Sequence, residues 1–368
     1  MPQLTVALSS APERPRLFDH RLELSAAEFL PLPFLPSLRG GLPRSWSCRR
    51  VIRSLEERSD AVVVQLPFAA TPALVGATKP RLYHLCADVL TQTRTSKFYG
   101  GARRPVALAM AHGIDRLQRH LIHRPHTRLV SNGEALWRHY GEPPGRWLVS
   151  STLMAGEIGS VVRQRPADAP FRVLFVGYLR HEKGFDVLLE AFRALLAKVP
   201  EAEMEIVGGI DYKGSGVDRL LADGLGSLED EGKVRLAGAL GFGPDLFRRF
   251  ADADVLVLPS RSEGTPRVLV EARAFGCPVV ASRVGGIPSS VTDGVDGLLF
   301  PPGDAAALAE TLIRLARDPE LRRRLAGAGL ETARRSTIEA FAGTLVEELE
   351  TLVADASSAP PQETADRP

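Results

Sequence analysis

Short apolar runs alternate with helical patterns throughout the second half of the chain. The runs are closed by glycine, proline or serine, and they lie at 172–177, 204–209, 234–238, 254–260, 278–282 and 297–300. Between them, apolar side chains recur at a spacing of three to four residues, which predicts helices over 184–199, 244–251, 266–275 and 305–315. Strands that alternate with helices form a parallel sheet covered on both faces. We therefore predict a Rossmann-like α/β domain over about 170–335.

The first half of the chain carries a less regular version of the same pattern. Apolar runs predict strands over 4–8, 61–66, 81–84 and 127–131, and helices over 48–58 and 104–119. These elements indicate a second doubly wound domain, although residues 10–45 fit neither period. The polar, proline-bearing segment 163–170 is predicted to be a linker. The predicted domains are therefore 1–165 and 166–335, followed by a helix over 336–353 and a disordered tail over 354–368 that lacks apolar residues.

Length and composition agree with two domains in a reducing compartment. A chain of 368 residues is long for a single core. The three cysteines, Cys48, Cys86 and Cys277, have no paired spacing, so we expect neither a disulfide framework nor a cysteine metal site. The first residues lack a signal-peptide pattern, and no run of about 18 apolar residues occurs. We expect a cytoplasmic protein.

Charge is distributed unevenly along the chain. Residues 1–165 carry a net charge of about +11, and the rest carries about −9. One interpretation is an anionic partner for the first half: a membrane surface, a phospholipid or a pyrophosphate-linked acceptor. The other is a solvated, arginine-rich surface. The apolar, proline-rich run 27–41 is open to a similar pair of interpretations, contact with a lipid-linked acceptor or a buried connection.

Two glutamates lie where an open α/β sheet binds its ligands. Glu263 falls in the loop after the predicted strand 254–260, at the carboxyl end of that strand. Thr265 and Pro266 have the residue types of a helix N-cap and first helical position, which places Glu271 about one and a half turns inside the helix. Gly264 allows a ligand to approach the backbone closely. The pair suits a phosphate-bearing sugar donor, and two solvated surface acids are the alternative.

A basic loop follows the first strand of the same predicted domain. Gly177 ends the strand, Arg180 and Lys183 follow, and Gly184 opens a helix. Cations at this edge are suited to neutralising a diphosphate leaving group. Taken alone, the loop is equally consistent with a solvated surface.

Three ordered patterns together resemble the family 4 retaining glycosyltransferases of GT-B fold. They are GYLRHEKGFDVLLEA at 177–191, the segment EGTPRVLVEARAFGCPVVASRVGG at 263–286, and DGVDGLLFPPGDAAALAETLIRL at 293–315. The resemblance implies two Rossmann-like doubly wound parallel-sheet domains that face each other across a cleft. It also implies transfer of a sugar from a UDP- or GDP-sugar to a glycan or lipid-linked acceptor, with retention of anomeric configuration. A metal is not required in this family, and we expect no nucleic-acid partner.

The resemblance assigns roles by position in this sequence. Glu263 would face the transferred sugar, Glu271 would hold the ribose hydroxyls, and Lys183 would pair with the diphosphate. The remaining donor-binding positions would form the strand end and the turn whose amides approach sugar and phosphate; they are Gly177, Tyr178, Gly264, Thr265, Pro266, Arg267 and Val268. The family has arginine where this chain has Tyr178, and Arg180 is a candidate substitute.

The acceptor side of the predicted site depends on the first domain. His84, at a strand end, resembles a histidine that related enzymes place near the reacting sugar; a histidine satisfied in a turn is the alternative. A metal site is disfavoured among His112, His120, His123 and His126, because no carboxylate or cysteine accompanies them.

Two other functions stay open. Tyr178 and the irregular residues 10–45 also fit a non-catalytic GT-B-like scaffold or a sensor that binds a sugar or a nucleotide. A nucleotide-sugar hydrolase or phosphorylase is a third interpretation.

Overall fold

The chain consists of two compact units. A computed structural model describes residues 4–9, 27–32, 38–67, 71–76, 78–95, 101, 103–166, 168–179, 181–209, 225–226 and 228–358, with side chains described from Cys48 onward except those of Thr95 and His181. Unit 1 comprises 1–132, 136–147 and 342–368, and unit 2 comprises 133–135 and 148–341. The units meet in sequence at 147/148, so residues 148–165 group with unit 2, upstream of the predicted division at 165.

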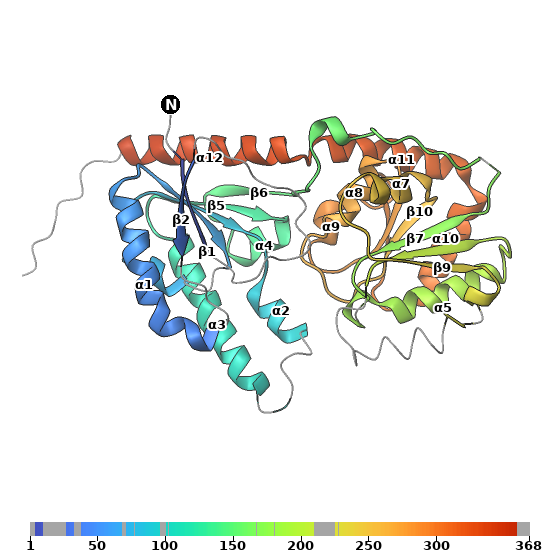
Figure 1. Ribbon diagram of the computed structural model, residues 1–368, viewed down its shortest axis with the longest axis horizontal. Helices are drawn as coiled ribbons and strands as arrows, with labels where there is room; N and C mark the ends of the chain where they lie inside the picture. Colours follow the sequence, from blue (N-terminus) through green and yellow to red (C-terminus); the bar gives the residue numbers. More distant parts are fainter. Residues whose placement is uncertain are drawn as a thin grey trace, which may run out of the picture. The chain divides into compact units, whose positions relative to one another are not determined.

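Unit 2 is built on a six-stranded parallel sheet (Figure 1). Its strands in spatial order are β9 (Val234–Gly238), β8 (Glu203–Val207), β7 (Arg172–Val176), β10 (Val255–Leu258), β11 (Val279–Ser282) and β12 (Leu298–Phe300). The strand order reverses between β7 and β10, which makes their carboxyl ends the topological switch point of the sheet. All six predicted strands of this half are confirmed.

Helices cover both faces of this sheet because β7 and β10 are apolar on both sides. Val173 and Phe175 of β7 pack in the core that α5 (Phe185–Leu196) and α10 (Ala305–Arg317) complete. Leu174 points to the opposite core, formed with α7 (Pro244–Asp252) and α8 (Val268–Ala274). Among the described residues of unit 2, the α-helices α9 (Ile287–Ser290) and α11 (Pro319–Arg334) were not predicted from the sequence.

Unit 1 also contains parallel strands flanked by helices. β3 (Val62–Leu66), β4 (Arg81–Leu85) and β5 (Thr127–Asn132) are parallel, and β6 (Gly145–Leu148) extends the sheet beside β5. β1 (Leu4–Ser9) pairs in parallel with β2 (Ala27–Leu32). The helices are α1 (Leu38–Glu57), α2 (Val89–Thr95), α3 (Arg103–Ile122) and α4 (Glu134–His139). The predicted strands and the helix over 104–119 are confirmed.

The predicted helix over 48–58 is correct in type but not in extent. α1 begins ten residues earlier, at Leu38, and includes Gly40, Gly41 and Pro43. These residues are poor helix formers, so the first turns are not recognisable in the sequence. The run 27–41 is divided between β2 and α1, and residues 10–26 and 33–37 lie outside the described part of the chain.

The last helix, α12 (Ile338–Ser358), extends five residues beyond the predicted end at 353. Residues from Ala342 onward belong to unit 1. There the buried carboxylate of Glu348 accepts from Nε of Arg128 at 2.6 Å and from Nε of Arg146 at 2.5 Å. The rest of the predicted disordered tail, 359–368, lies outside the described residues.

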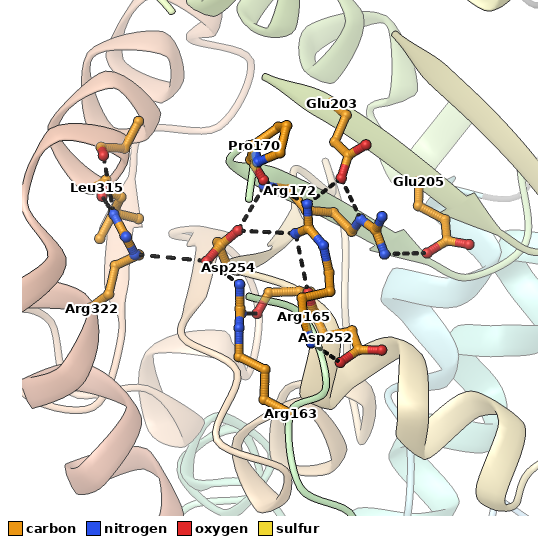
Figure 2. A network of polar contacts seen from close by, with 12 residues as sticks. Arg163, Arg165, Pro170, Arg172, Glu203, Glu205, Asp252, Asp254, Leu315 and Arg322 are labelled. Atoms are coloured by element: carbon orange, nitrogen blue, oxygen red, sulfur yellow. Dashed lines mark hydrogen bonds and ion pairs between the residues drawn. The ribbon is translucent and has the colours of Figure 1, made fainter. Parts of the chain in front are cut away.

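An arginine-rich network binds the predicted linker 163–170 to the amino ends of the strands in the unit 2 sheet (Figure 2). Asp254, just before β10, accepts from Nη2 of Arg163 at 3.0 Å and from the backbone N–H of Arg172 at 2.8 Å. Arg165 reaches both Asp254 and Glu203, the first residue of β8. Segment 163–165 is therefore part of unit 2 and not a free connection, because its charges complete the sheet edge.

Arg273 of α8 is fully buried and holds together three elements behind the sheet. Its Nη1 donates to Asp296 at 3.0 Å and to the carbonyl of Ser290 at 2.7 Å. Asp296 also accepts from the hydroxyl of Thr332 on α11 at 2.8 Å. A side chain on Gly329 would collide with Arg273, so α11 packs directly against it. This ion pair fixes α8 in place.

We predict that Arg273→Met strongly destabilises the protein. The substitution leaves the buried Asp296 without its guanidinium partner, and removal of one member of a buried pair costs about 3–5 kcal/mol. Urea denaturation of the full chain measures the change in the free energy of unfolding. Arg283→Gln is the matched control, because Arg283 pairs with Asp293 on the surface and such pairs contribute less than about 1 kcal/mol. Equal effects of the two substitutions would contradict the prediction.

Candidate functional site

The carboxyl ends of β7 and β10 bring together two of the predicted site residues. Lys183 ends the short helix η3 (His181–Lys183) after β7, and Glu263 lies in the loop after β10. Nζ of Lys183 is 2.6 Å from Oε1 of Glu263, and the hydroxyl of Ser260 donates to the same oxygen at 2.6 Å. The Glu263 side chain is only 9% exposed. A carboxylate and an ammonium group are thus held at the switch point of the sheet, where open α/β sheets bind ligands.

A second ion pair fastens the loop after β10 to α5. Nη1 and Nη2 of Arg261 donate to the two oxygens of Asp186 at 2.7 and 2.6 Å, which is the bidentate arrangement of a strong arginine–carboxylate pair. The backbone N–H of Arg261 also donates to the carbonyl of Glu182 at 2.8 Å. Hydrogen bonds from Arg261 lower the pKa of Asp186 below its ordinary value. Sequence reasoning did not single out this pair, although Asp186 stands inside the motif EKGFD.

Glycines allow three loops of the site to touch through their backbones. Gly184, the N-cap of α5, has φ +66°, and a Cβ there would lie 2.0 Å from the carbonyl oxygen of Pro259. Gly285 has φ +53°, and its Cβ would lie 1.9 Å from the carbonyl oxygen of Glu263. Side chains at these two positions would push the Glu263 loop away from its neighbours.

The predicted start of α8 at Thr265 and Pro266 is wrong. The helix begins at Val268, with Arg267 as its N-cap and no side-chain cap. Thr265 is buried instead, with its hydroxyl against two glycines: a Cβ on Gly133 would lie 2.3 Å from Thr265 Oγ1, and one on Gly286 would lie 2.6 Å away. The hydroxyl thus packs against the loops of Gly133 and Gly286.

Glu271 consequently lies in the first turn of α8, not one and a half turns inside a longer helix. It is buried, and its Oε1 accepts from the hydroxyl of Thr152 at 3.0 Å. Thr152 comes from the segment after β6, where the N–H of Ile338 donates to the carbonyl of Leu153 at 2.9 Å. Thr152 and Gly133 are far from the motifs in sequence, so no local signal could identify them.

The other predicted donor-binding residues differ in exposure. Tyr178 is 51% exposed, and Gly264 and Arg267 are also exposed. Gly177 lies against Gly208, the residue after β8, because a Cβ on Gly208 would lie 1.9 Å from the carbonyl oxygen of Gly177. Arg180, the candidate second cation, lies outside the described residues. Pro266 and Val268 are half-buried on either side of Arg267.

His84 belongs to unit 1, in β4 one residue before its end. Burial lowers its pKa to about 4. Its ring lies beside the thiol of Cys86, with Nδ1 and Sγ 3.6 Å apart. The imidazole is therefore neutral at neutral pH, and its proximity to a reacting sugar stays a prediction.

The clustered histidines do not converge on one point. His112 and His120 are exposed on α3, and Nε2 of His123 lies 2.6 Å from the carbonyl oxygen of Tyr140. Among the residues the structure describes, no three histidine, cysteine or carboxylate side chains are grouped as metal ligands would be. None of the helices in the described part of the chain has the length and apolar character needed to cross a membrane.

The second half of the chain is similar to a known protein family. Residues 162–332 match the family described as Glycosyl transferases group 1. A D-inositol 3-phosphate glycosyltransferase of Thermobifida fusca is 34% identical over 223 residues, 56% of this chain and 51% of that protein. The amylovoran biosynthesis glycosyltransferase AmsK of Erwinia amylovora is 33% identical over 226 residues, 56% of this chain and 54% of that protein. The match thus spans about half the length of these relatives, and residues 162–332 are similar to the group 1 glycosyltransferases.

Solved structures extend the likeness to the architecture of the whole chain. Sucrose-phosphate synthase from Thermosynechococcus elongatus has a TM-score of 0.68 at 20% identity, covering 96% of this chain and 89% of that one. Anabaena HepE in complex with UDP has a TM-score of 0.65 at 21% identity, covering 88% and 86%. At such identity the likeness concerns the fold alone. It confirms the predicted GT-B class with two Rossmann-like parallel-sheet domains.

We predict that Asp186→Asn loosens the Glu263 loop without unfolding the sheet. The substitution removes the negative charge that pairs with Arg261. Because both side chains are part-exposed, we expect only about a three- to tenfold faster amide hydrogen exchange over residues 259–264. Exchange in α7 should stay unchanged. Glu190→Gln, an exposed acid on the same helix α5, is the control. Unchanged exchange over 259–264 in Asp186→Asn would refute a positioning role for the pair.

We also predict that His84 makes the protein less stable as the pH falls from about 6.5 to about 4. The folded-state pKa of about 4 lies below the ordinary value of 6.5, so the unfolded chain takes up the proton first. Above pH 6.5 both states are neutral at this residue and the effect disappears. NMR titration of the His84 ring should give a midpoint near 4. In His84→Gln the loss of stability over this window should be smaller; an identical pH dependence would rule out this residue as its source.

Proposed function

We propose that this protein is a retaining glycosyltransferase that moves a sugar from a nucleotide-diphosphate-sugar to a glycan or lipid-linked acceptor. The observation that carries the proposal is the Lys183–Glu263 pair at the switch point of a group 1 glycosyltransferase domain. A ligand that is anionic at one end and rich in hydroxyls at the other matches such a pair. The sequence motifs support a UDP- or GDP-sugar as that ligand, and the structural relative HepE was solved in complex with UDP.

The two carboxylates suit different ends of the donor. Glu271 is buried in the first turn of α8 and already accepts one hydroxyl hydrogen bond, from Thr152. A ribose hydroxyl donating to the same carboxylate would bind in the same manner. Glu263 lies beside the cation and suits the hydroxyls of the transferred sugar. Lys183 would then neutralise the charge that develops on the diphosphate as the sugar departs.

The proposed transfer takes place on one face of the sugar. An acceptor hydroxyl oxygen forms a bond to the anomeric carbon while the bond from that carbon to the diphosphate oxygen breaks. The electron pair leaves with the diphosphate, and the hydroxyl proton passes to the departing phosphate oxygen. Attack from the side of the leaving group retains the anomeric configuration. Lys183 supplies the positive charge in this scheme, so we propose a reaction independent of metal.

The acceptor is proposed to bind through unit 1. The net charge of about +11 over residues 1–165 suits an acceptor that bears phosphate, or peripheral contact with an anionic membrane surface. His84, neutral near pH 7, can exchange hydrogen bonds with sugar hydroxyls without adding charge. The cytoplasmic location expected from the cysteine pattern stays a prediction.

We predict that a nucleotide sugar raises the melting temperature and that the two glutamates respond differently to substitution. A panel of UDP-, GDP- and ADP-sugars, with and without EDTA, identifies the donor through the thermal shift. Glu271→Gln should weaken binding of that donor about tenfold, because it weakens a charged hydrogen bond. Glu263→Gln should lower turnover at least about a hundredfold while the donor still binds.

Glu190→Gln is the control for both substitutions, since it removes one negative charge from the exposed face of α5. If no member of the panel shifts the melting temperature, the proposal fails. If Glu263→Gln leaves a measured turnover intact, the assigned role of Glu263 fails. A donor that binds without turnover in the native chain, with a partner interaction that survives Glu263→Gln, would favour the alternative of a non-catalytic sugar or nucleotide sensor.

A further inference from the structure

We infer that the Lys183–Glu263 ion pair makes the site distinguish an intact nucleotide sugar from the bare nucleoside diphosphate. The inference rests on the proposed function and concerns a competition within its site. The ammonium group that would bind the diphosphate is already bound, at 2.6 Å, by the carboxylate that would bind the sugar. A diphosphate that binds Lys183 therefore competes with Glu263 for its positive charge.

The Lys183–Glu263 pair is partly buried, so loss of the contact changes the free energy of either charged group. The side chain of Glu263 is 9% exposed and that of Lys183 is 25% exposed, so neither charge is fully solvated. Charges in such a setting interact more strongly than surface pairs, and a partly buried carboxylate that loses its cation is destabilised. When Lys183 binds a phosphate, the Glu263 carboxylate therefore needs another hydrogen-bond donor.

The loop holds Glu263 where a sugar would supply that replacement. The Ser260 hydroxyl donates to the same carboxylate oxygen as Lys183, and Ser260 is itself buried and held by the hydroxyl of Ser282. Arg261 and Gly285 fix the loop on either side. Glu263 thus has a fixed anchor that does not depend on Lys183, and its carboxylate stays at the sheet edge when the lysine turns to a phosphate.

The two possible ligands differ in what they offer Glu263. An intact donor brings sugar hydroxyls, which can donate to the carboxylate as its diphosphate takes Lys183. The nucleoside diphosphate alone brings no such donor and adds negative charge beside the carboxylate. Glu263 therefore opposes the product and accepts the substrate, and after transfer it can reclaim Lys183 as the nucleoside diphosphate leaves.

A thermodynamic cycle tests this competition. Affinity for UDP is measured by titration calorimetry, or for GDP where the thermal-shift panel favours a GDP-sugar. Glu263→Gln should raise this affinity at least about fivefold, the lower end of ordinary coupling between sites, because Lys183 is freed. In the Lys183→Met background the same substitution should change the affinity less than about twofold. Glu190→Gln should leave it unchanged in both backgrounds.

Glu263→Asp provides a second measurement that keeps the charge. The shorter side chain draws the carboxylate back from Lys183, so competition predicts a rise in nucleoside diphosphate affinity here as well. Simple repulsion predicts an affinity close to that of the native chain. The comparison remains decisive even if Lys183→Met folds poorly.

Each outcome has a defined meaning. An equal gain from Glu263→Gln with and without Lys183 would show direct repulsion and overturn the inference, as would no gain in the native background. Either result is compatible with a native protein that binds and transfers its nucleotide sugar. Failure of the proposed function is distinct, because then neither nucleotide sugar nor nucleoside diphosphate binds any variant.

Discussion

The parallel pairing of β7 with β10 is the constraint on which the site depends. Val255 and Leu256 pair with Val173 and Leu174, so two strands about 80 residues apart in sequence run side by side. Each strand is apolar on both faces and is held between helices by burial. Their carboxyl ends must then open at one edge, and the loops that follow can contact each other. The polar chemistry of the site is thus positioned by apolar strands that contribute no functional group.

At the amino ends of the same strands, ion pairs and hydrogen bonds to charged side chains stabilise the sheet. Asp254 precedes β10 and accepts from both Arg163 and the backbone of Arg172 at the start of β7 (Figure 2). These contacts fix the same two strands from their amino ends. Arginines are well suited to this edge, because a planar guanidinium can bridge several acceptors at once. One pair of strands is therefore fixed by a charge network at one end, and its loops are left to bind ligands at the other.

Sequence patterns predicted most of the helices and strands, but they did not predict where the helices begin or which distant residues make contact. Short apolar runs closed by glycine, proline or serine predicted each strand that the structure describes in unit 2, because strands buried on both faces are continuously apolar. The start of α1 was not predicted because Gly40, Gly41 and Pro43 have low helix propensity. Glu263 and Lys183 were predicted to share an edge from topology alone. The Arg261–Asp186 clamp and the contact of Thr152 with Glu271 were not, because a hydrogen bond between distant segments leaves no periodicity.

The two glutamates of the site are held in physically different ways, and this difference fits their proposed roles. Glu271 accepts from a neutral hydroxyl and stands on α8, which Arg273 fixes from behind through buried hydrogen bonds. Glu263 is held partly by a cation, and an anionic ligand can take that cation away. A fixed acceptor suits the part of the donor that stays the same through the reaction, whereas an exchangeable pair suits the bond that is broken.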